Sequence, residues 1–183
     1  MISGRTEIIT WVVSSVALCA LVTDVLKGKI FNWLTLPALA LGLVVSFALS
    51  GTDGLLDGAA GALLGLLLFG WMFRIGVMGG GDVKLLMALG TWGGSVFVVE
   101  TALMSIFLGG ILAAALLLIR GKARDFVARV KTFLLSLALK DSKKYPFEMD
   151  RGNTMPFGIA IACAAVWIAV ESPFVHWGQW PWR

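Results

Sequence analysis

Charged side chains are scarce in this chain: 14% of its 183 residues are Asp, Glu, Lys or Arg, while 58% are hydrophobic. A soluble domain has about a quarter charged and about half apolar residues, so this composition excludes an ordinary soluble protein. The net charge is only +4 and gives no argument for nucleic acid as a partner. We expect a membrane protein with a single domain over residues 1–183.

Cysteine and histidine are also rare, with two cysteines and one histidine in the whole chain. Cys19 and Cys163 stand inside apolar stretches without a CxxC pair, which argues against a disulfide framework and against a zinc site. We expect both cysteines to be small side chains of the protein core. The sequence therefore predicts no metal and no other cofactor.

Long apolar runs are what the chain has in abundance. They are continuous and do not alternate every second residue, which favours helices over the strands of a membrane barrel. No small-x-small cleavage site follows the first run, so we expect it to remain as a helix. The expected fold is all-α, a polytopic membrane bundle of about six transmembrane helices. The six runs lie at 7–26, 32–50, 55–77, 83–99, 101–119 and 154–171.

Lysine and arginine gather in alternate loops of this predicted bundle, as they do in cytoplasmic loops of membrane proteins. The loops between them carry acidic residues instead. Both termini are therefore expected outside, and the long loop at 120–152 in the cytosol. The basic residues are Lys27, Lys29, Arg74, Lys84 and nine more within 120–151, and the acidic residues of the opposite loops are Asp53, Asp57, Glu100 and Glu171.

The long basic loop at 120–152 contains an amphipathic stretch. Phe126, Val130, Phe133 and Leu137 recur at helical spacing, while basic residues take the other side. The pattern predicts a helix that lies on the anionic lipids of the cytoplasmic leaflet. The alternative is a soluble helix that caps the bundle.

Two aspartates, Asp24 and Asp82, lie near the cytosolic ends of the first and fourth spans. Ionisable groups in membrane helices are costly and are functional candidates by default. Two carboxylates that meet share one proton, which suits one as general base toward water and the other as general acid toward a scissile carbonyl. The alternative is that Asp24 is hydrated near Lys27 and that neighbouring glycines only allow close helix packing.

Three glycines precede the second aspartate in the segment MGGGDVK. We expect Gly79, Gly80 and Gly81 to allow positive φ angles and a close approach to another chain, such as a substrate strand, and to leave Asp82 on a mobile stretch beside a helix N-terminus. Lys84 is two residues beyond Asp82 and so on another face of the helix. It is expected to reach the cytosolic surface, a substrate or a lipid head group.

The segment GGGDVK resembles the GxGDxK signature of the type IV prepilin peptidases, which are membrane aspartyl proteases. The stretch TDVLKGKIFNWLTLPALALG is similar to the first-aspartate segment of that family, and MPFGIAIACA to the opening of its last helix. One departure is Phe31, which stands where the family usually has a proline that would stiffen the turn. The matching residues are Gly79, Gly81, Asp82, Lys84, Asp24, Ile30, Asn32, Pro37, Pro156 and Gly158.

The resemblance implies an aspartic endopeptidase of the bacterial or archaeal cytoplasmic membrane, with Asp24 and Asp82 as its catalytic pair at the cytosolic face. Its substrates would be pilin or pseudopilin precursors with a short basic leader, a small residue before the cut, a glutamate a few residues after it and then an apolar helix. Pilus assembly machinery is a further expected partner. Substrate-binding or loop-shaping roles are implied for Gly79, Gly80, Gly81, Lys84, Asn32, Pro156 and Gly158.

Larger members of the family carry an additional cytosolic loop with paired CxxC motifs and an N-methyltransferase activity. This chain has neither that loop nor those cysteines. It resembles the short peptidases of tight-adherence (Flp-type) pili, so we expect peptidase activity without methylation.

Two functions of other classes are left open by the residues. A small carrier or channel would use Asp24 and Asp82 to bind a proton or cation, although neither is near the bilayer midplane and the chain shows no inverted repeat. A noncatalytic subunit of a pilus export machine would not need either aspartate. Loss of precursor cleavage on replacing Asp24 or Asp82 would distinguish the peptidase from both.

Overall fold

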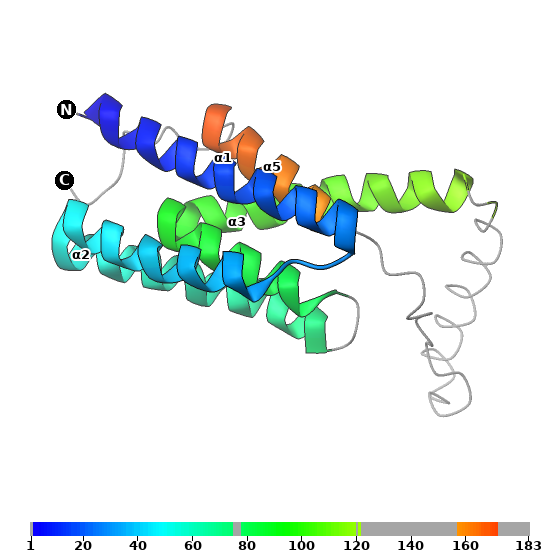
Figure 1. The fold of residues 1–183 in the computed structure, drawn as a ribbon, viewed down its shortest axis with the longest axis horizontal. Helices are drawn as coiled ribbons and strands as arrows, with labels where there is room; N and C mark the ends of the chain where they lie inside the picture. Colours follow the sequence, from blue (N-terminus) through cyan, green and yellow to red (C-terminus); the bar gives the residue numbers. More distant parts are fainter. Residues whose placement is uncertain (1, 75–77, 120, 122–156, 172–183) are drawn as a thin grey trace, which may run out of the picture. The chain divides into compact units, whose positions relative to one another are not determined.

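The protein is described here by a computed structural model that covers residues 2–74, 78–119, 121 and 157–171 (Figure 1). These residues form four helices, α1 (Ile2–Lys27), α2 (Asn32–Arg74), α3 (Gly80–Ile119) and α5 (Phe157–Glu171), and contain no strand. The predicted all-α class is confirmed. The residues up to Gly109 and those of α5 form one compact unit, and a second unit begins at Gly110. The helix predicted within 120–152 lies outside the described residues.

Two of the helices, α2 and α3, fold back on themselves at a glycine. The reversals lie at Gly51, with φ 62°, and at Gly94, with φ 82°, a backbone region that favours glycine. Figure 1 shows α2 running out and back. Beyond its turn, Gly58 packs on Ser46, which precedes the turn, and an added Cβ would lie 3.4 Å from Ser46 Oγ. Taken separately, the two arms of α2 and the two arms of α3 overlap the predicted runs 32–50, 55–77, 83–99 and 101–119.

The second of these turns lies earlier than the sequence predicts. The prediction ends one span before Glu100 and starts the next after it, but the chain turns at Gly94. Glu100 lies inside the second arm of α3 and is only 7% exposed. Asp53 lies beside the Gly51 turn, as expected of a loop charge, whereas Asp57 lies further along the second arm of α2. Glu100 is therefore no marker of a loop, because this reversal occurs at a glycine with positive φ.

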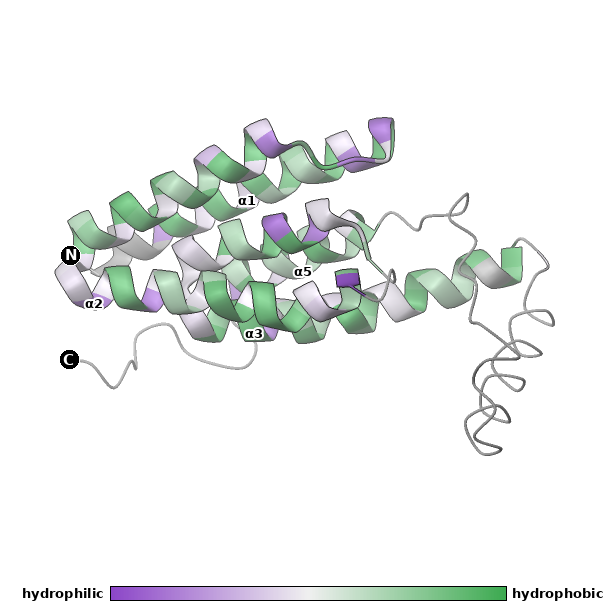
Figure 2. Cartoon of the chain, turned by 90° about the horizontal axis from the view of Figure 1, so that it is seen from below, coloured by the Kyte–Doolittle hydropathy of each residue, from purple (hydrophilic) through white to green (hydrophobic). Residues whose placement is uncertain are grey.

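Among the described residues, three helices are long and apolar enough to cross a membrane, and large apolar side chains cover their outer faces. Figure 2 shows hydrophobic residues along their whole length. Exposed apolar surface of this extent is typical of a surface that lipid covers, so the chain is a membrane protein. Cys19 and Cys163 are exposed on this surface, so their expected place in the core is wrong. The three segments are Glu7–Lys27, Asn32–Arg74 and Gly80–Leu116.

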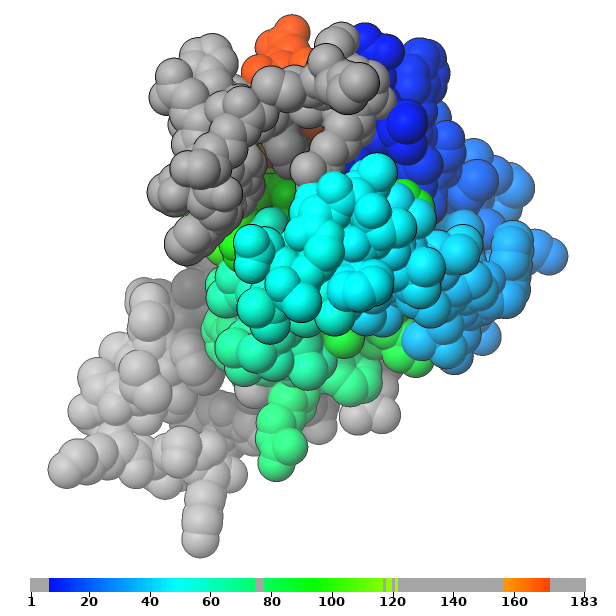
Figure 3. Space-filling model, turned by 90° about the vertical axis from the view of Figure 1, so that its left-hand side faces the viewer, coloured from blue at the N-terminus to red at the C-terminus, as the bar shows by residue number. Residues whose placement is uncertain are grey.

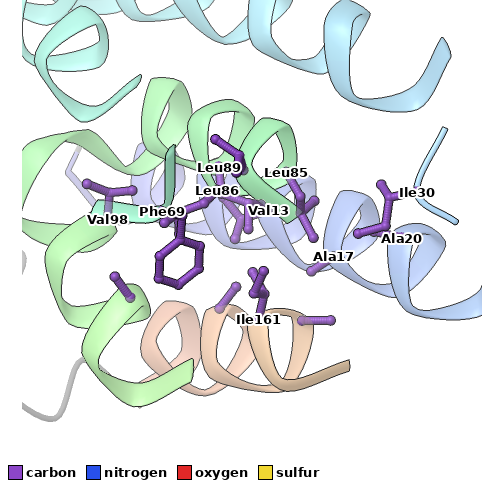
Figure 4. Close-up of a cluster of buried hydrophobic side chains, with 14 of the residues drawn as sticks. Val13, Ala17, Ala20, Ile30, Phe69, Leu85, Leu86, Leu89, Val98 and Ile161 are labelled. Atoms are coloured by element: carbon purple, nitrogen blue, oxygen red, sulfur yellow. The ribbon is translucent and has the colours of Figure 1, made fainter. Parts of the chain in front are cut away.

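The core lies where α1, α3 and α5 meet, with Phe69 of α2 among them (Figure 4). The helices α1 and α5 run side by side, and Thr10 Oγ1 donates to the Ala169 carbonyl over 3.1 Å. Since the start of α1 meets the end of α5, the end of α1 meets the start of α5. The labelled core residues are Val13, Ala17, Ala20, Ile30, Phe69, Leu85, Leu86, Leu89, Val98 and Ile161.

The first arm of α3, residues 80–93, packs backbone to backbone against the second arm of α2. An added Cβ at Gly58 would lie 2.9 Å from the Thr91 carbonyl oxygen, and one at Gly90 would lie 2.6 Å from the Gly61 carbonyl oxygen. Small residues at helical spacing let two membrane helices approach this closely. A side chain at any of these glycines would push the two arms apart.

The first arm of α2 holds the same part of α3 through two hydrogen bonds. Trp92 Nε1 donates to the Ala38 carbonyl over 2.8 Å, and Ser46 Oγ donates to the Thr91 carbonyl over 2.8 Å. The turn of α2 and the start of α1 lie at one end of the unit, which faces the viewer in Figure 3. The first residues of α2 and of α3 lie at the opposite end (Figure 1).

Candidate active site

Asp24 lies in the last turn of α1. The helix ends at Lys27, and Gly28, with φ 60°, donates its N–H to the Asp24 carbonyl over 2.8 Å. Such a glycine just beyond the last turn is a common way to end a helix. The Asp24 side chain is 7% exposed, and its Oδ2 has no hydrogen-bond partner among the described residues. A buried carboxylate oxygen without a partner is costly, and it marks this position as a functional candidate.

The first turn of α5 faces the Asp24 carboxylate. The backbone amides of Gly158 and Ile159 point toward it, and the free N–H groups of a helix N-terminus favour a negative charge. An added Cβ at Gly158 would lie 2.6 Å from Asp24 Oδ2, closer than nonbonded atoms approach. Glycine at this position therefore makes the room in which the carboxylate rests on the end of α5. Pro156, predicted together with Gly158, lies outside the described residues.

Asp82 lies in the first turn of α3, and 8% of its surface is exposed. The Gly79 N–H donates to Asp82 Oδ2, and the Asp82 N–H donates to the Gly79 carbonyl, each over 3.2 Å. An acidic side chain that returns to the N–H preceding its helix is a common N-terminal cap. Asp82 thus helps to begin α3 while its carboxylate remains at the end of the helix.

Asp24 and Asp82, which the sequence places on different helices, lie in one neighbourhood of the structure, because Ile30 adjoins both Gly81, which precedes Asp82, and Gly158, which adjoins Asp24. Both side chains are buried, and the charge of Asp24 acts on Asp82. Neighbouring carboxylates in proteins share a proton and titrate as a unit. A pair of this kind has the groups needed for acid–base chemistry on one substrate.

The three glycines before Asp82 do not take the positive φ angles expected of them. Gly80 and Gly81 belong to the first turn of α3, so Asp82 is part of a helix and does not lie on a loop ahead of it. Their role is close approach to the chain itself: an added Cβ at Gly81 would lie 3.0 Å from Ile30 Cβ, and one at Gly80 3.2 Å from the ring of Phe73. The positive-φ glycines of the described residues are Gly28, Gly51, Gly94 and Gly121.

Ile30, in the link between α1 and α2, contacts the surroundings of both aspartates. It packs on Gly81, which precedes Asp82, and its Cδ1 would lie 2.9 Å from an added Cβ at Gly158, which adjoins Asp24. The side chain is itself buried. We expected a substrate strand to lie beside the glycines. In the structure, the link between α1 and α2 occupies that place.

Lys84 points toward the start of α2. Its Nζ donates to Asn32 Oδ1 over 2.9 Å, so the bond joins the first turns of α2 and α3. This contact agrees with the expectation that Lys84 and Asp82 do not pair. Phe31, in the place of the usual proline, accepts the Thr35 N–H with its carbonyl over 3.3 Å and begins α2 without a proline ring.

Asp57 has a role that the sequence reading missed. Its Oδ1 accepts the Ser95 N–H over 3.1 Å and the Ser95 hydroxyl over 2.6 Å. An added Cβ at the neighbouring Gly94 would collide with the same carboxylate. The signal available in the sequence was the triplet Gly93-Gly94-Ser95, which interrupts an apolar run with turn-forming residues. In the described ranges, no three His, Cys, Asp or Glu side chains gather as a metal ion would need.

Three relatives are similar to the chain over a large part of its length. A prepilin leader peptidase/N-methyltransferase of Pseudomonas putida is 32% identical over 144 residues, which cover 75% of this chain and 40% of that protein. A protein of the same name from Pseudomonas aeruginosa is 40% identical over 93 residues, 48% of this chain and 32% of the relative. The one from Stutzerimonas stutzeri is 33% identical over 121 residues, with coverages of 63% and 40%.

No solved structure matches the chain. The chain spans about two fifths of the length of the curated relatives it matches, or less. Residues 11–114 match the type IV leader peptidase family, and this range is more than half of the chain and includes both Asp24 and Asp82. The chain therefore belongs to the type IV leader peptidase family.

Proposed function

We propose that the chain is an aspartic endopeptidase of the membrane that removes the leader from type IV pilin-like precursors. The family and the printed names of its relatives, prepilin leader peptidases, support this reaction. The observation that carries the proposal is the pair of buried, interacting carboxylates of Asp24 and Asp82 at the ends of two helices.

The proposed reaction starts with one carboxylate ionised and the other protonated. The ionised group takes a proton from a water molecule, the water oxygen attacks the scissile carbonyl carbon, and the protonated group gives its proton to the carbonyl oxygen. The tetrahedral intermediate then returns a hydroxyl proton to the second carboxylate. The C–N bond breaks as the first gives its proton to the leaving amine. The pair ends with the single proton with which it began.

The surroundings of the two aspartates support these roles as general base and general acid. Asp24 Oδ2 is unpartnered in the described structure and so has free capacity to bind a water molecule. Both carboxylates rest on helix N-termini, Asp24 on that of α5 and Asp82 on that of α3, which stabilises the ionised form during the reaction. Neither aspartate has an ion-pair partner that would hold it in a purely structural role among the described contacts.

The proposed site faces the cytosol, because the predicted basic loops lie at the same end of the spans as the two aspartates. A pilin-like precursor would leave its basic leader in the cytosol and its apolar helix in the membrane. Its scissile bond would then lie near the interface, where water is available without a channel through the protein.

Cleavage of a pilin-like precursor by the purified protein in phospholipid vesicles tests the proposal. We expect cleavage by the wild type and at least about 100-fold slower cleavage by Asp24→Asn or Asp82→Asn, with unchanged helix content by circular dichroism. Asp53→Asn is the matched control, because Asp53 is exposed on α2 and should cleave as the wild type does. Cleavage at the wild-type rate by both active-site variants would refute the proposal, and proton flux that depends on the aspartates without any cleavage would indicate a carrier instead.

Methylation is judged in the same assay. The relatives are named as N-methyltransferases as well as peptidases. We predict that the mass of the cleaved product does not change when S-adenosylmethionine is supplied. A gain of one methyl group at the new N-terminus would contradict this prediction.

A further inference from the structure

The turn of α3 at Gly94 is held by a carboxylate from another helix. Asp57, in the second arm of α2, accepts both the N–H and the hydroxyl of Ser95, the first residue after the turn. Gly94 takes φ 82°, and its Cα lies so close to the Asp57 carboxylate that a side chain would not fit. The other turn has no such neighbour, since an added Cβ at Gly51 would meet nothing within 4 Å.

We propose that Asp57 is a positioning residue that sets the register of the first arm of α3 against α2 and thereby the place of Asp82. The proposal rests on the proposed function, in which Asp82 is catalytic. Asp57 does not touch the substrate in this proposal and acts only through the backbone of α3.

The first step of the argument is the chemistry of a broken helix in a membrane. The first N–H groups after the turn have no carbonyl partner in their own helix, and lipid offers none. Asp57 supplies that partner for Ser95, and its charge lies at the N-terminus of the second arm, where the helix dipole favours it. The lowest-energy position of the turn is therefore the one that keeps Ser95 on Asp57.

The second step is the way a shift at the turn reaches Asp82. The first arm of α3 contacts α2 through backbone atoms, at Gly58 with Thr91 and at Gly61 with Gly90. No side chain stands between the two backbones there to absorb a displacement by changing its rotamer. A displacement of the chain at Gly94 along α2 therefore moves the whole first arm of α3. Asp82, in the first turn of that arm, moves with it.

Cleavage kinetics of Asp57→Ala and Asp57→Asn test this inference. We expect Asp57→Ala to lower kcat about tenfold or more, because it removes the cap, with KM changed less than about twofold. Asp57→Asn should keep kcat within about threefold, because its amide oxygen still accepts both bonds from Ser95. Asp53→Ala is the matched control on the same helix and should cleave at the wild-type rate.

Cross-linking reports the register without any cleavage. Cysteines placed at Asn32 and Lys84, whose side chains are hydrogen-bonded between α2 and the first arm of α3, should be joined by a short bifunctional thiol reagent in a chain with Cys19 and Cys163 replaced by alanine. Adding Asp57→Ala should lower the cross-linked fraction several-fold, and adding Asp57→Asn should leave it unchanged.

The two measurements separate the inference from the function on which it rests. Unchanged cross-linking in the Asp57→Ala protein would overturn the inference, whatever its rate of cleavage. An equal loss of kcat in Asp57→Asn and Asp57→Ala would also overturn the inference. The asparagine variant keeps an oxygen that accepts the bonds from Ser95, so it should be much less affected. If Asp24→Asn and Asp82→Asn still cleaved the precursor at the wild-type rate, the proposed function would fail while the cross-linking result would still decide the role of Asp57.

Discussion

At one end of the first arm of α3, Asp57 accepts two hydrogen bonds from Ser95, whereas at the other end Asp82 accepts one, from the Gly79 N–H. Asp24, beside Asp82, is buried with Oδ2 unbonded to any described residue. The two bonds from Ser95 tie the Asp57 carboxylate to the turn of α3, so this group holds structure in place. Asp24 faces the amides of Gly158 and Ile159 but keeps capacity for water and substrate at Oδ2, and that difference separates the two ends of this arm.

The largest expected effect concerns the end of the arm at Asp82. Asp24→Asn and Asp82→Asn should each lower kcat by about 10²–10⁴-fold, because each removes one partner of the proposed acid–base pair. The double variant should be no slower than either single variant, since the two carboxylates act as a unit. Single-turnover cleavage in vesicles measures this. A further loss in the double variant, equal to the product of the single losses, would show that the aspartates act separately.

A slightly smaller effect is expected where Asp24 rests on α5. Gly158→Ala should lower kcat by about 10- to 100-fold, because the added methyl group displaces the Asp24 carboxylate, which acts in the proposed reaction. Gly110→Ala is the matched control, since an added Cβ there meets nothing within 4 Å. The comparison is made from initial rates at saturating precursor. Equal rates for the two variants would show that Gly158 is not needed for room beside Asp24.

The end of the arm at Asp57 should show its effect in stability. Gly94→Ala should lower the free energy of unfolding by about 3 kcal/mol, because the new side chain takes an unfavourable φ and meets Asp57. Gly51→Ala should lower the free energy of unfolding by only about 1 kcal/mol. Its new side chain has the strain of a positive φ but meets no other atom within 4 Å. Unfolding in mixed micelles of rising SDS content measures both. Equal losses would mean that the Asp57 carboxylate does not crowd Gly94.

The smallest effect is expected at the exposed bond between Lys84 and Asn32. Asn32→Ala and Lys84→Met should each lower the free energy of unfolding by about 0.5–1 kcal/mol, as is usual for one exposed hydrogen bond. The double variant should lose no more than one single variant if the two side chains serve only each other. Additive losses in the same unfolding assay would indicate that Lys84 also has another partner.

Much of the fold could be predicted because apolar runs long enough to cross a bilayer can be identified from the residue types alone. The boundary between the fourth and fifth runs could not be placed correctly. Glu100 was the obvious polar interruption, yet it is buried inside a helix, while the chain turns at Gly94. The choice between them depends on backbone conformation and on Asp57, a contact between distant segments that no local pattern reveals.

The candidate site could be predicted as far as it depends on the type of residue and on its position along a membrane span. Asp24 and Asp82 could be paired from their places near the same ends of two spans, and in the structure Ile30 adjoins the surroundings of both. Their catalytic role stays a prediction. The expected positive φ of the three glycines was wrong, because Gly81 is required by the closeness of Ile30 and not by its own backbone angle. Asp57 was predicted to be a charge of a loop. Its contact with Ser95 could not be predicted, because Ser95 belongs to a different predicted span.

The first arm of α3 is also short. Residues 80–93 number 14 and extend about 21 Å as a helix, against about 30 Å of hydrocarbon in a typical bilayer. Asp82 and the Gly94 turn cannot both lie at the surfaces of an undeformed bilayer. The surrounding lipid relieves such a hydrophobic mismatch by thinning, which draws the interface and its water toward the ends of the arm. The acyl-chain length of the host membrane thus becomes a control on how readily water reaches the aspartates.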